Sequence, residues 1–173
     1  MRTETTTRNI YTFDELSDRA KDKARDWWRR GALGYAWWEF IFEDAESIGL
    51  KIKEFDIYGN GYAKGAFTRC PVEVAERIKE NHGEACETYS TATAFLKERA
   101  AFMDGAEKDE FGELATYELD RKLEDIEADF LKSLLEDYAV ILQREHDWQL
   151  EDEQAEASIR SNGYEFTEDG EVA

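Results

Sequence analysis

The sequence predicts an α+β fold in which about five to six helices, including one long C-terminal helix, pack with a small antiparallel sheet. Apolar residues recur every three or four positions over most of the chain, which is the period of amphipathic helices. Two β-prone runs flank Gly59-Asn60-Gly61, and Asn-Gly favours the tight turn of a hairpin. The chain has a single proline, so little interrupts its helices.

The N-terminal part is expected to contain one strand and two helices. Residues 1–7 are polar and rich in threonine, and we expect them to be flexible. Residues 9–13 are β-prone and predict a short strand. The helix that follows ends at Gly31, and a second amphipathic helix covers 36–48.

The middle of the chain predicts a hairpin followed by two helices. The hairpin strands cover 50–58 and 62–68. Pro71 then opens a helix, because proline is tolerated at the first helical position. That helix ends at Gly83, and another covers 84–103.

A long helix over about 113–148 dominates the C-terminal part. It has an apolar stripe with steps of mostly three or four residues, so one face should be buried and the other solvated. The stripe consists of Leu119, Leu123, Ile126, Phe130, Leu134, Tyr138, Ile141 and Trp148. A short acidic helix over 151–160 and a strand over 164–167 follow, and the strand is expected to complete the sheet. No linker or internal repeat divides the chain, so residues 1–173 are expected to form one domain.

The charge of the protein is strongly negative and unevenly placed. The chain has 41 acidic and 22 basic residues, a net charge of −19. Residues 1–103 have a net charge of −2, whereas residues 104–173 have a net charge of −17. Such a field repels nucleic acids and anionic membranes and attracts basic protein surfaces. The alternative interpretation is that the acidity serves solubility alone.

Carboxylates of the acidic region are the candidate partner-binding residues. They are Glu118, Asp120, Glu124, Asp125, Glu127, Asp129, Glu136, Asp137, Glu151, Asp152 and Glu153. Four of these could instead hold a divalent ion or act as an acid–base pair: Glu124, Asp125, Glu127 and Asp129. They alternate with Leu123, Ile126 and Phe130 of the apolar stripe, so a solvated face is the preferred interpretation.

Two tryptophan pairs, Trp27-Trp28 and Trp37-Trp38, offer candidate aromatic anchors. Adjacent helical residues point about 100° apart, so both members of a pair do not easily enter the same core. Trp28 and Trp38 are therefore candidate exposed anchors for a partner. The alternative is a core that surrounds each helix on both sides.

Motifs of catalysis and of metal or cofactor binding are absent from the sequence, so we predict neither an enzyme nor a cofactor. His82 and His146 are not placed in any zinc-ligand spacing. Cys70 and Cys86 predict two ordinary thiols. The sequence contains neither a signal-peptide run nor about 20 consecutive apolar residues, so we expect a cytoplasmic protein that does not bind membranes.

Five stretches together cover most of the chain and resemble a family of small acidic proteins from tailed phages and prophages. They are YTFDELSDRAKDKARDWW, WWEFIFEDAESIGLKI, NHGEACETYSTATAFLKERAAF, ADFLKSLLEDYAVILQREHDW and SIRSNGYEFTEDG. Members of that family are often labelled as the antitoxin of a toxin–antitoxin stability system. The resemblance implies a protein that works in the cytoplasm of a host bacterium, and it implies no catalytic mechanism.

Charge and resemblance together lead to one functional hypothesis. The protein is expected to bind and inhibit a host defence protein at its basic nucleic-acid-binding surface, as an anti-CRISPR-like or anti-restriction-like DNA mimic. It is not expected to bind nucleic acid directly. The alternatives are an antitoxin-like protein that neutralises a basic toxin, a phage regulatory or accessory binding protein, and a metal-dependent nuclease.

Overall fold

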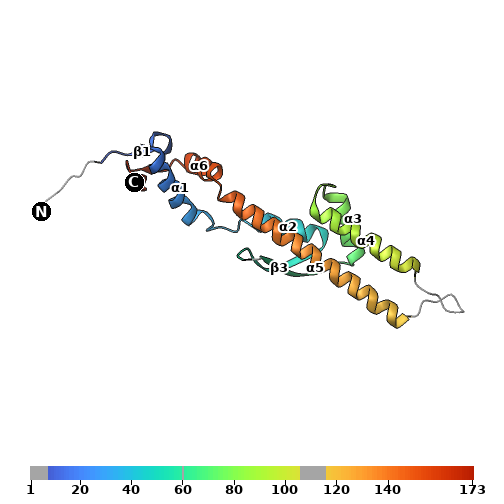
Figure 1. Ribbon diagram of the computed structural model, residues 1–173. Helices are drawn as coiled ribbons and strands as arrows, with labels where there is room; N and C mark the ends of the chain where they lie inside the picture. Colours follow the sequence, from blue (N-terminus) through green and yellow to red (C-terminus); the bar gives the residue numbers. More distant parts are fainter. Residues whose placement is uncertain (1–7, 60, 106–115) are drawn as a thin grey trace. The chain divides into compact units, whose positions relative to one another are not determined.

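The computed structural model describes residues 8–59, 61–105 and 116–173, and it confirms the α+β class (Figure 1). The described residues form six α-helices, one 3-10 helix and four strands. In chain order these are β1 (Tyr11–Thr12), the 3-10 helix η1 (Phe13–Glu15), α1 (Asp18–Ala32), α2 (Glu39–Ile48), β2 (Leu50–Asp56), β3 (Tyr62–Phe67), α3 (Pro71–Asn81), α4 (Glu87–Gly105), α5 (Thr116–Gln149), α6 (Asp152–Ser161) and β4 (Glu165–Phe166). The predicted flexible segment 1–7 lies outside the described residues, as does Asn60 of the predicted turn.

The expected single domain is divided into two compact units. Unit 1 contains the chain up to Trp37 together with Glu145–Ala173, and unit 2 contains Trp38–Arg144. Each unit has buried side chains of its own. No pattern in the sequence indicated this division, because no linker separates the units and α5 runs through the boundary at Arg144.

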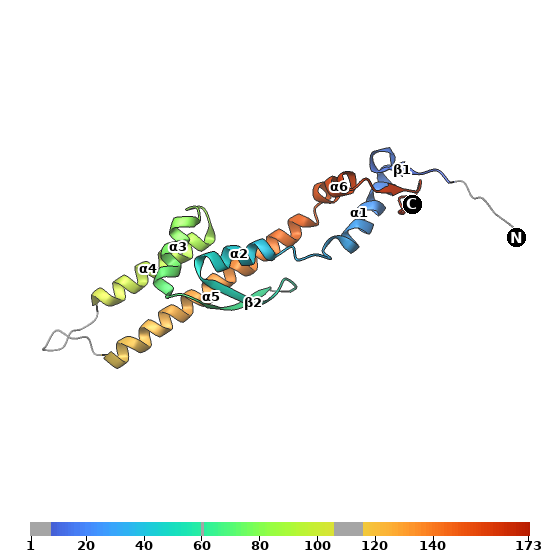
Figure 2. The ribbon, with the colours of Figure 1, turned by 180° about the vertical axis from the view of Figure 1, so that it is seen from behind.

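Unit 1 brings the two ends of the described chain together. β1 pairs antiparallel with β4, and α1 packs against α6 (Figures 1 and 2). Ser17 begins α1 as its N-cap, accepting a hydrogen bond from the backbone N–H of Ala20. Side chains from both ends of the chain share the core, which consists of Phe13, Leu16, Ala20, Ala24, Ile159 and Phe166.

The strand predicted over 9–13 is shorter than expected. The carboxylate of Glu15 accepts hydrogen bonds from both the backbone N–H and the hydroxyl of Thr12. This capping box turns the chain into η1 directly after Thr12. As a result, Phe13 leaves the strand and enters the core, where it is buried.

Unit 2 consists of a hairpin and four helical segments. β2 and β3 pair antiparallel, and a bulge shifts their register between Ile52 and Glu54. Figures 1 and 2 show the hairpin and α2 beside α5, and the ring of Phe67 on β3 lies 5.3 Å from that of Phe130 on α5. Gly61 has a φ of 57°, the left-handed backbone that the predicted turn requires.

The four strands form two separate two-stranded sheets, so the prediction of one sheet is wrong in this detail. β4 pairs with β1, whereas β2 pairs with β3. The physical reason is the division into units, which places the strands of the chain ends and those of the hairpin in different cores.

The long helix is confirmed from Thr116 to Gln149, and its predicted start at 113 lies outside the described residues. Its buried positions are Phe130, Leu134, Tyr138 and Leu142, which are spaced four apart. Trp148, which the sequence placed in the same stripe, is 46% exposed.

Candidate binding surfaces

Four of the predicted carboxylates form an exposed set near the start of α5. Asp120, Glu124, Asp125 and Asp129 are all exposed, and none forms an ion pair with another described residue. Asp120 and Glu124 are four residues apart, as are Asp125 and Asp129, so each pair lies on neighbouring turns of one face. These four side chains are the available acidic surface of α5.

The other carboxylates predicted on α5 are less available. Glu136 lies 3.9 Å from the ammonium of Lys132, and Glu127 is half-buried. Asp137 is also half-buried, and its carboxylate accepts a 2.7 Å hydrogen bond from the hydroxyl of Thr91 on α4. Asp137 therefore belongs to the contact between α4 and α5. The side chain of Glu118 lies outside the described part of the structure.

Burial raises the pKa of Asp137, because a partly desolvated carboxylate is less stable in its charged form. The hydrogen bond from Thr91 opposes this effect by stabilising the anion. The nearby negative charges of Glu87 and Glu136 raise the pKa further. Charging this carboxylate therefore costs free energy in the folded protein.

In unit 1, basic side chains of α1 neutralise part of the C-terminal acidity. Residues 1–37 contain eight basic and six acidic residues, whereas residues 145–173 contain one basic and ten acidic residues. Arg29 pairs with Asp152, and Arg25 lies 2.5 Å from Glu156 and 3.6 Å from Asp152. Asp152 therefore forms ion pairs between α6 and α1 while its side chain is 62% exposed, and its partner-binding role stays a prediction.

Glu151 and Glu153 remain available in unit 1. Both are exposed, and neither forms an ion pair with another described residue. Elsewhere in the same unit, Arg160 pairs with Asp14 at 2.9 Å and with Glu156 at 2.9 Å. The charge asymmetry along the chain thus partly serves the folding of unit 1.

Neither of the two predicted tryptophan anchors is an exposed side chain. Trp28 is half-buried against the core of unit 1, and its indole N–H donates a 3.0 Å hydrogen bond to Ser158. Trp38 is half-buried in unit 2, with its ring 5.5 Å from that of Phe55. Both tryptophans of α1 are thus partly buried, as in the alternative interpretation, whereas Trp38 precedes α2 as its N-cap.

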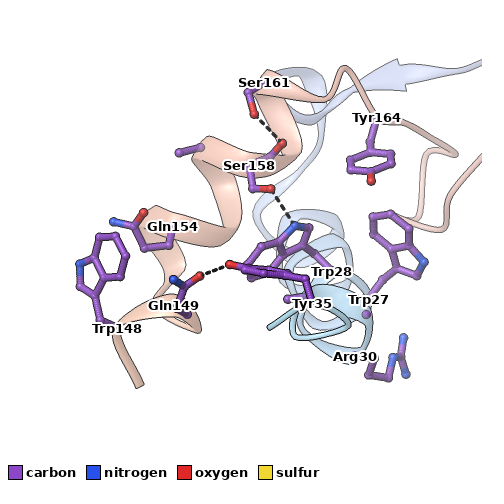
Figure 3. Close-up of a pocket in the computed structure, with 13 residues that line it drawn as sticks. Trp27, Trp28, Arg30, Tyr35, Trp148, Gln149, Gln154, Ser158, Ser161 and Tyr164 are labelled. Atoms are coloured by element: carbon purple, nitrogen blue, oxygen red, sulfur yellow. Dashed lines mark hydrogen bonds between the residues drawn. The ribbon is translucent and has the colours of Figure 1, made fainter. Parts of the chain in front are cut away.

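An aromatic groove of about 920 Å³ lies within unit 1 (Figure 3). Its aromatic lining comprises Trp27, Trp28, Tyr35, Trp148 and Tyr164, and its polar lining includes Arg30, Gln149, Gln154, Ser158 and Ser161. Local sequence patterns did not predict this groove. Its lining comes from both ends of the chain, so no local pattern could have revealed it.

Two exposed rings make the aromatic groove a candidate binding site. Tyr35 is 56% exposed and Trp148 is 46% exposed. The hydroxyl of Tyr35 donates a 2.7 Å hydrogen bond to the side chain of Gln149, which fixes the ring at the groove (Figure 3). Trp, Tyr and Arg are the residue types that most often anchor protein interfaces.

A polar network connects four helical segments of unit 2. The hydroxyl of Tyr138 on α5 donates a 2.7 Å hydrogen bond to Asp44 on α2, and Asp44 lies 3.5 Å from Nε2 of His82. Nδ1 of His82 lies 2.8 Å from the hydroxyl of Thr88. The contact with His82 lowers the pKa of Asp44, an effect that burial opposes and the Tyr138 hydroxyl reinforces.

This network has the residue types of a catalytic triad, but its hydroxyl is inaccessible. Thr88 is only 2% exposed, so a substrate cannot reach its oxygen. We therefore assign the network to the packing of α2, the end of α3 and the start of α4 against α5.

The described residues contain no group of three His, Cys, Asp or Glu side chains arranged to hold a metal ion. Glu124, Asp125, Glu127 and Asp129, the alternative metal or acid–base set, are not brought together with further ligands. Cys70 and Cys86 are both exposed free thiols. None of the described helices is both long and apolar enough to cross a membrane.

Comparisons with protein-family models, with curated proteins and with solved structures give no significant match.

Proposed function

We propose that the protein acts by binding a basic, nucleic-acid-binding surface of a host defence protein, and that it inhibits this protein by excluding nucleic acid. The observation that carries the proposal is the exposed, unpaired carboxylate set Asp120, Glu124, Asp125 and Asp129 on α5. Carboxylates at i and i+4 on a helix stand about 5–6 Å apart. Lys and Arg side chains arranged for phosphates can accept such a row of negative charges.

The overall charge supports this proposal. A net charge of −19 accelerates encounter with a basic partner and disfavours binding to nucleic acid itself. The four exposed carboxylates of this set contribute locally, because they form no ion pairs with other described residues, in contrast to Asp152 and Glu156 of unit 1.

The first experiment captures the partner from a bacterial lysate with the full-length protein and identifies it by mass spectrometry. Binding to the captured partner is then measured at low and high salt. Association should slow steeply as salt is added, because exposed charges are screened beyond about 8–10 Å at physiological ionic strength. DNA or RNA should compete for the same site on the partner.

Charge reversal locates the contact. The double variant Glu124→Lys/Asp125→Lys should lose binding and inhibition while the fold is unchanged, since both side chains are exposed. The matched control is Glu43→Lys/Glu46→Lys, which makes the same charge change at exposed positions on α2 outside the predicted binding set. Equal losses in both variants would mean that only net charge matters. An unchanged affinity in the α5 variant would refute the proposal.

The aromatic groove of unit 1 supports a second contact model. If it anchors the partner, Tyr35→Ala and Trp148→Ala should weaken binding by about 2 kcal/mol or more each, as interface hot spots do. Affinity would then depend little on salt, and the lysine variants of α5 would remain active. The same measurements on both classes of variant decide between the two models.

A further inference from the structure

β3 has an outer edge whose backbone groups are unpaired within the described structure. The backbone N–H of Thr68 donates a 2.8 Å hydrogen bond to the carbonyl of Gly49, just outside the hairpin register. Alternation along an antiparallel pair then directs the backbone groups of Lys64 and Ala66 toward β2. The backbone N–H and C=O groups on the other edge belong to Ala63, Gly65 and Phe67.

An apolar groove of about 500 Å³ lies between the start of β3 and α5. Its β3 side includes Tyr62 and Ala63, and its α5 side includes Ala128, Leu131, Leu135 and Val140. Tyr62 and Val140 are 39% and 41% exposed, so apolar surface remains open to water there.

Gly65 allows the backbone of β2 to approach closely, and it also lies against a side chain of α5. A β-carbon at this position would lie 2.4 Å from the carbonyl oxygen of Lys51 and 3.2 Å from a methyl group of Leu135. The side of β3 that carries residues 63, 65 and 67 therefore faces α5. The outer edge of β3 and the apolar groove therefore lie next to each other.

The acidic set of α5 continues this groove. Glu124 and Asp125 precede Ala128 by four and three residues, so they lie on the same face one turn earlier. Both are exposed and form no ion pair with other described residues. An occupant of the groove therefore meets mostly apolar side chains along α5, together with the Lys132–Glu136 ion pair, and negative charge at its end.

We propose that β3 and α5 together bind an extended segment of the partner protein, which pairs with the outer edge of β3 as an added strand. Only an extended backbone matches the alternating donors and acceptors of a strand edge. The segment carries apolar side chains at alternate positions, facing the α5 groove, and Lys or Arg residues beside Glu124 and Asp125. The expectation that the segment carries Lys or Arg residues rests on the proposed function, whereas the expectation of strand pairing does not.

A second copy of the chain is the less favourable occupant. Each copy has a net charge of −19 and presents the same acidic face, so pairing of two copies would bring like charges together. The charge of the groove's surroundings instead favours a basic partner.

The test uses a short synthetic peptide in which valine and threonine alternate between pairs of lysines. Hydrogen exchange of individual amides is followed by NMR in the full-length protein. When most of the protein is bound, the outward amides of Ala63, Gly65 and Phe67 should exchange up to about tenfold more slowly than in the free protein. The inward amides of Lys64 and Ala66 are internal controls and should change little.

A matched peptide with the same side chains but N-methyl groups at alternate residues cannot donate hydrogen bonds to the edge. It should give no protection, and Ala63→Pro should weaken binding of the parent peptide, because proline removes an outward donor that β2 does not use. Equal binding of the two peptides, or no protection of the outward amides, would overturn the added strand.

A third peptide, in which glutamates replace the lysines, separates the two proposals. If it protects the outward amides as well as the lysine peptide does, strand pairing stands but the acidic set does not select a basic partner, and the proposed function fails. If only the lysine peptide binds, and Glu124→Lys/Asp125→Lys abolishes its binding, both proposals are supported.

Discussion

Asp137 shows that a carboxylate of the acidic region can work against the fold. Its carboxylate is half-buried between α4 and α5, accepts a hydrogen bond from Thr91 and lies near the negative charges of Glu87 and Glu136. Its pKa is raised in the folded protein, primarily by burial. Folding therefore favours the protonated form of this side chain over the charged form.

Asp137→Asn should stabilise the protein at pH 7 by up to about 1 kcal/mol, since the amide can still accept from Thr91 without a charge. The sign follows from linkage: an acid with a raised folded pKa costs stability once the pH rises above its unfolded pKa of about 3.9. The gain should therefore shrink as the pH falls toward 4 and vanish below it. Urea unfolding at several pH values measures this dependence.

Glu136→Gln is the control for that measurement, because it removes a neighbouring carboxylate that is exposed. It should change stability by less than about 0.5 kcal/mol. A destabilised Asp137→Asn variant at pH 7 would mean that the negative charge is needed at the contact between α4 and α5.

At the scale of elements, α5 is the helix on which the core of unit 2 depends. The ring of Phe130 stacks on that of Phe95 of α4 at 4.2 Å and lies 5.3 Å from that of Phe67 on β3. One side chain thus joins three elements. The face of α5 that carries Glu124 and Asp125 remains in water.

Phe130→Ala should lower the free energy of unfolding by about 3–5 kcal/mol, because it leaves a cavity among rings that cannot all relax into it. Phe130 is 3% exposed, so nearly all of its surface is lost from the core. Glu124→Ala on the exposed face should change stability by less than about 0.5 kcal/mol. Chemical denaturation of both variants tests the helix phase, and similar losses would show that the assigned buried face is wrong.

At the scale of the whole molecule, the two units have separate cores. The core of unit 1 includes Phe13, Ile159 and Phe166, and that of unit 2 includes Phe95 and Phe130. The units share one continuous helix, α5, whose residues up to Arg144 belong to unit 2. Local stability can therefore differ between the units.

Phe166→Ala should accelerate amide exchange in unit 1, for example at Ala24 of α1, while amides such as Ile78 in α3 of unit 2 keep their protection. The physical reason is that Phe166 packs in the core of unit 1, with its ring 6.5 Å from that of Phe13. Native-state hydrogen exchange by NMR measures both sites in one sample. Phe130→Ala is the reciprocal control. Equal acceleration in both units would show that they unfold as one.

Local patterns in the sequence were sufficient to predict most of the elements. The Asn-Gly turn, the proline that opens α3 and the apolar period of α5 act through neighbours only a few residues away, so they identify the hairpin and the helices. The sequence also predicted the exposed carboxylates Glu124, Asp125 and Asp129, because they alternate with residues of the apolar stripe.

Only the tertiary structure decided which charges are free and how the elements group. Asp152 meets Arg25 and Arg29 across more than 120 residues of chain, and that distant pairing separates it from free carboxylates of the same charge. The division into two units, the pairing of β1 with β4 and the aromatic groove likewise depend on contacts between the two ends of the chain. Sequence periodicity reports which face of an element is apolar, but the partner of that face is set by long-range packing.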